Sequence, residues 1–73
     1  MPAHFDASAF LRDRWGDPLR LRDFLANYGH EVEWATINQW FRRGRIPPDW
    51  LATLLSLSEL EAGAPLSIAK YLA

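Results

Sequence analysis

The chain has 73 residues, no Cys and a formal net charge of −1 at pH 7. A chain of this length forms one small domain, residues 1–73, and it has no thiol for a disulfide or a thiolate metal site. Because 49% of the residues are apolar, we expect the hydrophobic core alone to stabilise the fold. No charged start followed by an apolar run indicates a signal peptide, and no apolar stretch approaches the about 20 residues of a membrane span. We therefore expect a soluble, cytoplasmic protein.

Two helices are predicted in the first third of the chain. Apolar residues recur at helical spacing from Phe5 to Trp15, with Asp6 and Ser8 as possible caps, and Gly16 ends this segment. Asp17 and Pro18 then have the residue types of an N-cap and a first helical position. One apolar stripe follows before Gly29 closes the second helix: Leu21, Phe24, Leu25 and Tyr28.

A third, amphipathic helix is predicted after a short connection at residues 30–33. Ile37, Trp40 and Phe41 fall on one face of it, and Gly44 takes the left-handed C-cap position. Ile46 is pushed toward an extended conformation by the proline that follows it.

A fourth helix is predicted to start at Pro47, Pro48 and Asp49, with an apolar face made by Trp50, Leu51, Leu54 and Leu55. Ser58 with Glu61 has the pattern of a capping box that starts a further turn. The segment 63–65 then breaks the chain, and LSIAKYLA at residues 66–73 predicts a final short helix. Since no strand signal is present, the expected fold is all-α, a small five-helix bundle.

The charges are unevenly distributed. Residues 12–45 hold seven Arg against five acidic residues, whereas residues 46–73 hold one Lys against three. The guanidinium group suits bidentate hydrogen bonding to phosphate and guanine. The charges are interleaved, so a solvated face with ordinary ion pairs is the alternative interpretation.

The third helix carries residue types that read DNA. If Val32, Ile37 and Trp40 face inward, helical geometry turns a polar set outward. These candidate base-reading residues are Trp34, Ala35, Asn38, Gln39 and Arg42. Asn and Gln can offer a donor and an acceptor to adenine, and Arg can offer two donors to guanine. Candidate phosphate contacts are Arg20, Arg22, Arg43 and Arg45, together with the N-terminus of the fourth helix, which Asp49 is expected to cap.

These residues resemble the lambda-repressor-like helix-turn-helix proteins, particularly the short Cro-like regulators of phages. FLANYG at 24–29 resembles the end of the family's second helix, and VEWATINQWFRRGRIP at 32–47 resembles its recognition helix with the Trp, Arg-Gly and Ile-Pro ending. The resemblance implies a lambda-repressor-like fold with a central helix-turn-helix. It also implies that Trp34, Ala35, Asn38 and Gln39 face bases, and that Ile37 and Trp40 lie in the core.

The chain departs from the family pattern at two places. Leu25 stands where the family usually has Ala, and the turn between Gly29 and Trp40 is about two residues longer than usual. Both departures predict that the second and third helices lie further apart. Trp34 has two interpretations, contact with a thymine methyl group or packing beneath the second helix.

The expected function is sequence-specific binding of double-stranded DNA by a transcriptional regulator. Because one such module buries little surface on DNA, we expect a homodimer on a two-fold site. The alternative is a protein-interaction module, such as an antitoxin or a transcription-regulator adaptor.

Other activities find little support in the sequence. No spacing pairs a nucleophile with a base, so we expect no enzyme, no small-molecule substrate and no cofactor. His4 and His30 lack partners at metal-ligand spacing and are expected at the surface. The aromatic residues Phe24, Tyr28, Trp40, Phe41 and Trp50 are expected in the core. Leu66, Ile68, Tyr71 and Leu72 either close the bundle or pair with a second copy.

Overall fold

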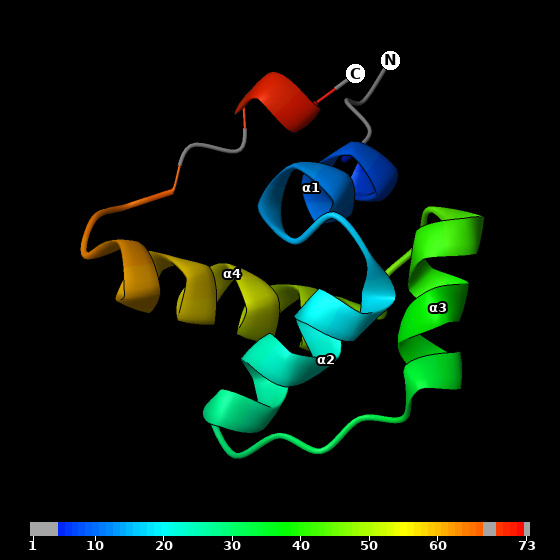
Figure 1. Cartoon of the computed structure of the whole chain (residues 1–73). Helices are drawn as coiled ribbons and strands as arrows, with labels where there is room; N and C mark the ends of the chain where they lie inside the picture. Colours follow the sequence, from blue (N-terminus) through cyan, green and yellow to red (C-terminus); the bar gives the residue numbers. More distant parts are fainter. Residues whose placement is uncertain (1–4, 67–68, 73) are drawn as a thin grey trace.

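A computed structural model describes residues 5–66 and 69–72. It contains α1 (Ala7–Arg14), α2 (Pro18–Asn27), α3 (Trp34–Arg43), α4 (Pro48–Ala62) and the short 3-10 turn η1 (Ala69–Tyr71) (Figure 1). The prediction of an all-helical fold is confirmed, because the described residues pair only in one isolated bridge, Phe5 with Leu72. The prediction of five α-helices is wrong: the described residues form four, and the last segment makes a single 3-10 turn instead.

The first two helices begin at side-chain caps. The Asp6 carboxylate accepts a hydrogen bond from the N–H of Ala9 at 3.1 Å, so Asp6 rather than Ser8 caps α1. The Asp17 carboxylate accepts from the N–H of Arg20 at 3.0 Å, and Pro18 follows as the first helical residue, as predicted. Each cap satisfies one of the N–H groups that a helix start leaves without an intrahelical partner.

The third and fourth helices end at glycines in the left-handed conformation. Gly44 has φ of 67° and Gly63 has φ of 70°. L-residues rarely adopt this conformation, because their Cβ meets the backbone there. Gly44 also lies close to α1, since a Cβ added at this position would sit 3.1 Å from the Oγ of Ser8. The same Ser8 hydroxyl donates a long hydrogen bond of 3.5 Å to the carbonyl of Phe41, so α1 and the end of α3 are in direct contact.

Two predictions for the fourth helix are wrong. The expected capping box does not interrupt the chain, because α4 runs without a break from Pro48 to Ala62 and Ser58 lies fully buried within it. Asp49 does not cap the helix: the N-cap residue is Pro47, which makes no side-chain hydrogen bond. The carbonyl of Asp49 instead accepts a hydrogen bond from the Thr53 hydroxyl at 3.0 Å.

One core joins the four helices. α3 packs against both α1 and α2, and α4 joins them through its side chains. The side chains with no exposed surface come from every helix: Phe10, Leu11, Leu21, Leu25, Ile37, Leu54 and Ser58. The ring of Trp40 lies 5.7 Å from that of Trp50, which attaches the start of α4 to α3.

Of the five aromatic residues predicted for the core, four lie in or against it. Trp40 is buried, and Phe24, Phe41 and Trp50 pack on the core while half-buried. Tyr28 is half-buried as well, and its ring centroid lies 5.2 Å from that of Phe24.

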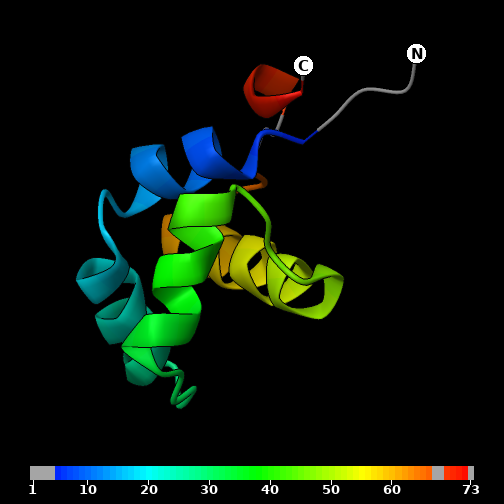
Figure 2. The same ribbon diagram turned by 90° about the vertical axis from the view of Figure 1, so that its right-hand side faces the viewer.

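The end of the described chain closes the bundle over α1. Tyr71 is buried, and its ring lies edge-on to Phe10 at 5.4 Å and to Phe5 at 6.1 Å. The N–H of Asp6 donates to the carbonyl of Tyr71 at 2.6 Å, so η1 lies beside the start of α1 (Figures 1 and 2). Leu72, by contrast, remains 45% exposed. His4 and Ile68 lie outside the described residues.

Candidate nucleic-acid interface

None of the helices that the structure describes covers the outward side of α3 (Figure 2). Figure 2 shows α3 nearest the viewer, with α1 above it, α2 beside it and α4 behind it. The predicted inward face is confirmed: Ile37 has no exposed surface, Trp40 has 4%, and Val32 packs against the core while half-buried. Because the helix turns 100° per residue, the positions opposite Ile37, Trp40 and the half-buried Phe41 face away from the bundle.

The predicted base-reading residues divide by exposure. Ala35, Gln39 and Arg42 are exposed, and their spacing of four and then three residues places them along the middle of the outward face. Asn38 lies at the edge of this face and is half-buried. Trp34 occupies the same edge four residues earlier, where 44% of its surface is exposed. That exposure favours an external contact over packing beneath α2.

The four predicted phosphate contacts differ in their ionic partners. Arg20 lies 3.7 Å from the carboxylate of Asp17, and Arg22 lies 3.7 Å from that of Asp23. Both pairs are exposed and long, and such pairs contribute little to stability.

The arginines of α3 and of the turn after it differ from Arg20 and Arg22. Arg42, Arg43 and Arg45 are exposed, and within the described residues they form no ion pair. An anion that approached these guanidinium groups would therefore displace no acidic side chain of residues 5–66 and 69–72.

Two adjoining hollows connect the arginines with the outward face of α3. Gln39, Arg42 and Arg43 line a small one of about 180 Å³. A larger one, of about 380 Å³, lies between the end of α3 and the start of α4. It is lined by Gln39, Trp40, Arg43, Arg45, Ile46, Pro47 and Pro48. Gln39 and Arg43 border both hollows, so the two hollows adjoin between the outward face of α3 and the start of α4.

The N-terminus of α4 is a weak anion site. Its first residue, Pro48, has no N–H group, and Asp49 follows in the first turn with its negative charge. The cationic character of this end of the surface therefore comes from Arg43 and Arg45 rather than from the helix dipole.

His30, in the connection between α2 and α3, contacts both α2 and α4. The N–H of His30 donates to the carbonyl of Leu25 at 2.9 Å, and the His30 ring meets the Trp50 ring edge-on at 5.7 Å. His30 is thus half-buried against α4 rather than free at the surface. Six residues, 28–33, separate the two helices, which is longer than the 3–4-residue turn of a typical helix-turn-helix.

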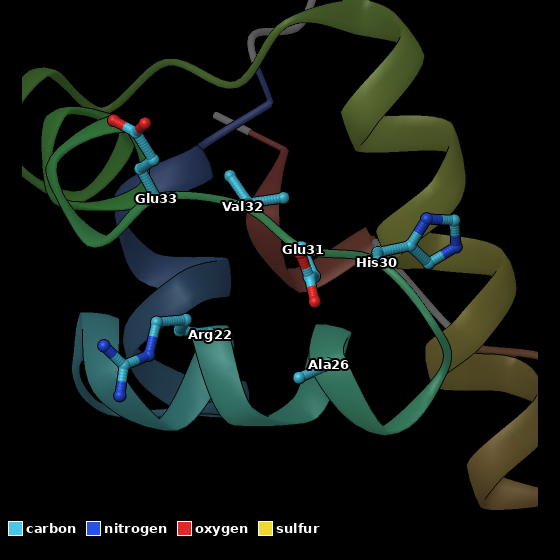
Figure 3. Close-up of a pocket in the computed structure, with 6 residues that line it drawn as sticks. All are labelled: Arg22, Ala26, His30, Glu31, Val32 and Glu33. Atoms are coloured by element: carbon cyan, nitrogen blue, oxygen red, sulfur yellow. The ribbon is translucent and has the colours of Figure 1, made fainter.

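A depression of about 420 Å³ lies between α2 and this connection. Figure 3 shows Arg22 and His30 at its opposite ends, with His30 directed toward α4. Glu31 and Glu33 also line it. Since both signs of charge meet here, the depression presents no uniform attraction for an anion, and Arg22 is a weaker candidate for an anion contact than Arg43 or Arg45.

Two residues beside the outward face of α3 were not identified from the sequence. Thr36 is exposed and precedes Arg43 by seven residues, so both lie on the same side of α3, at the edge opposite Trp34. Glu33 is the N-cap residue of α3, but its side chain makes no capping hydrogen bond. The exposed carboxylate of Glu33 adds a negative charge at the start of α3. The helical spacing from Arg43 was a sufficient signal for Thr36, whereas the missing cap appears only in the structure.

None of the described helices has the length and apolarity that crossing a bilayer requires. In the described part of the chain, no three His, Cys, Asp or Glu side chains gather in a way that would hold a metal ion. Comparison of the chain with protein-family models, with curated proteins and with solved structures found no match.

Proposed function

We propose that this chain is a sequence-specific DNA-binding transcriptional regulator of the lambda-repressor-like, Cro-like type, in which α3 enters the major groove. The observation that carries this proposal is the uncovered face of α3, where exposed Gln39 and Arg42 adjoin arginines that have no acidic partner among the described residues. The major groove is wide enough for one helix and presents donors and acceptors that amide and guanidinium groups can read.

The position of each residue on this surface determines the role that we propose for it. Gln39 and Arg42 occupy the middle of the outward face and read base edges, and Asn38 contributes from the edge of that face. Arg43 and Arg45, beside the hollow at the start of α4, hold the phosphate backbone and set the register of α3. Arg20 and Arg22 contribute secondary phosphate contacts from α2, because each is already near a carboxylate.

Net charge does not oppose this function. The formal charge of −1 belongs to the whole chain, whereas the candidate interface is locally cationic. Long-range attraction to DNA is weak for such a protein, so affinity depends on the contacts of the interface itself. Glu31 and Glu33 near the start of α3 reduce non-specific attraction further, which favours discrimination between sequences.

The proposal is tested by measuring affinity for duplexes selected from a random pool, over a range of salt concentrations. Each phosphate contact adds about −0.9 to the slope of log Kobs against log[salt]. Gln39→Ala is expected to weaken binding by about 1–3 kcal/mol at particular base pairs. Arg43→Ala is expected to weaken binding to all sequences and to reduce the salt slope by about 1. Arg12→Ala, an equal charge change on α1, serves as the control and is expected to preserve sequence preference.

A homodimer is part of the proposal. One module of this size covers only part of a binding site, and two copies on half-sites one helical turn apart, about 34–36 Å, recover affinity. Selected sites are expected to be palindromic. Sedimentation that shows one chain per duplex on a palindromic site would contradict the dimer.

A protein-interaction module, such as an antitoxin or a regulator adaptor, is the second candidate. The observation that favours it is the exposed apolar surface outside α3: Leu60 is 67% exposed near the end of α4, and Leu72 is 45% exposed. Affinity for a partner through such a surface would be nearly independent of salt, whereas DNA affinity would fall steeply.

A further inference from the structure

The outward face of α3 is divided along its length into two chemically different halves. The N-terminal turn presents the indole of Trp34 and the methyl group of Ala35, whereas the C-terminal half presents Gln39, Arg42 and Arg43. Of the large hydrophobic side chains that are exposed in the described residues, Trp34 is the one that belongs to α3. The amphipathic pattern of α3 does not account for it, because it lies outside the buried stripe of Ile37 and Trp40.

This apolar turn is continuous with the proposed reading face. Ala35 lies in line with Gln39 and Arg42, four and seven residues later, and Trp34 lies beside Asn38 at the edge of the same face. A helix that places Gln39 and Arg42 on base edges therefore carries Trp34 and Ala35 into the same groove.

The major groove offers one apolar group to such a surface, the C5 methyl of thymine. The other groups on the base edges are hydrogen-bond donors and acceptors, and covering them with an indole would leave them without partners at a cost in affinity. We infer that Trp34 and Ala35 recognise thymine methyl groups at the end of the half-site opposite to the bases read by Gln39 and Arg42. This inference rests on the proposed function.

The spacing of the residues predicts the layout of the half-site. Seven residues separate Ala35 from Arg42, which is about 10 Å along a helix. Base pairs stack every 3.4 Å, so this length covers roughly three steps. The half-site is therefore expected to carry a thymine about three base pairs from the guanine or adenine that the C-terminal half of α3 reads.

Charge favours DNA over a protein as the group that covers Trp34. The same face carries Arg42 and Arg43, which form no ion pair among the described residues. A polyanion neutralises these groups while its groove covers the indole. Leu60 and Leu72, the exposed apolar residues that support the second candidate, belong to α4 and to the bridge with Phe5 rather than to α3.

The experiment replaces each thymine of a selected duplex with deoxyuridine, one at a time, because this removes only the methyl group. At one or two positions in each half-site, the affinity of the wild-type protein is expected to fall about fourfold, the change that the loss of one buried methyl group gives. Trp34→Ala is expected to bind thymine and deoxyuridine duplexes equally at the position that the indole covers. Leu60→Ala removes another exposed apolar side chain, and Arg42→Ala changes the polar half, so both are expected to retain the methyl effect.

The outcomes separate this inference from the proposed function. Sequence-specific binding without any methyl effect in the wild-type protein would overturn thymine recognition and leave DNA binding intact. The same methyl effect in Trp34→Ala as in the wild type would remove Trp34 from that role. No salt-dependent affinity for any duplex would overturn both proposals. The wild-type measurement needs no variant, and thermal unfolding of Trp34→Ala establishes that it is folded.

Discussion

Ser58 provides the sharpest test of the packing of α4. Its side chain has no exposed surface, and its Oγ finds no hydrogen-bond partner among the described residues. Burying a polar group without a partner costs about 1–3 kcal/mol. Alanine removes only the hydroxyl, so Ser58→Ala leaves no sizeable cavity. We therefore expect Ser58→Ala to stabilise the fold by about 1–3 kcal/mol, plus the helix propensity of Ala, which exceeds that of Ser by about 0.5 kcal/mol.

Ser56→Ala is the matched control for that substitution. Ser56 lies two residues earlier in α4, and it is exposed. The propensity gain is the same at both positions, so the difference between the two variants isolates the burial of the hydroxyl. Denaturant unfolding gives both free energies, and each kcal/mol also raises Tm by about 4–8 °C in a domain of this size. If Ser58→Ala were no more stable than Ser56→Ala, the hydroxyl would have a partner and the packing described for α4 would be wrong.

Four further substitutions test the core, two helix ends and a cap by the same unfolding measurement. Trp40→Ala is expected to lower the free energy of unfolding by about 3–5 kcal/mol, because Trp40 is only 4% exposed. A variant as stable as the wild type would contradict the position of Trp40 in the core. Gly44→Ala and Gly63→Ala both place a Cβ at positive φ, which costs about 1–2 kcal/mol of folding free energy. Only the Cβ at residue 44 also lies near another side chain, 3.1 Å from the Oγ of Ser8. Gly44→Ala is therefore expected to lower the free energy of unfolding more than Gly63→Ala does. An equal decrease in the two variants would show that the Ser8 side chain moves aside freely. Asp17→Ala removes the N-cap of α2 and is expected to lower the free energy of unfolding by about 1 kcal/mol. An unchanged free energy of unfolding would mean that the cap does not stabilise the fold.

The helix ends were the most predictable part of the fold. Asp17 before Pro18 begins α2, and Gly44 and Gly63 end α3 and α4 in the left-handed conformation. Each of these signals acts within one turn of the chain, through a side-chain cap or a restricted φ. Such local physics can be read from neighbouring residues without knowledge of the fold.

The two faces of α3 were also predictable. The apolar spacing of Ile37 and Trp40 placed both in the core, and Ala35, Gln39 and Arg42 consequently face outward. The period of 3.6 residues determines which side chains share a face. That the outward face would remain uncovered, however, depended on where the other helices lie.

Contacts between distant segments decided the features that sequence reasoning missed. Ser58 and Glu61 match a capping box, but α4 continues through them, and Ser58 lies fully buried within the helix. Tyr71 was compatible with a second copy of the chain, and its contacts with Phe5 and Phe10 instead close the bundle. Local patterns cannot rank such alternatives, because the free energy of burial comes from partners that are remote in sequence.

The amino-acid sequence by itself therefore determined the helical class, the main helix boundaries and the polar face of α3, since these depend on backbone preferences and on the helical period. The tertiary structure decided that Trp34 is exposed at the edge of that face and that Arg43 and Arg45 border a common hollow. Exposure and concavity are properties of the packed helices, because each depends on which surfaces the neighbouring elements leave open.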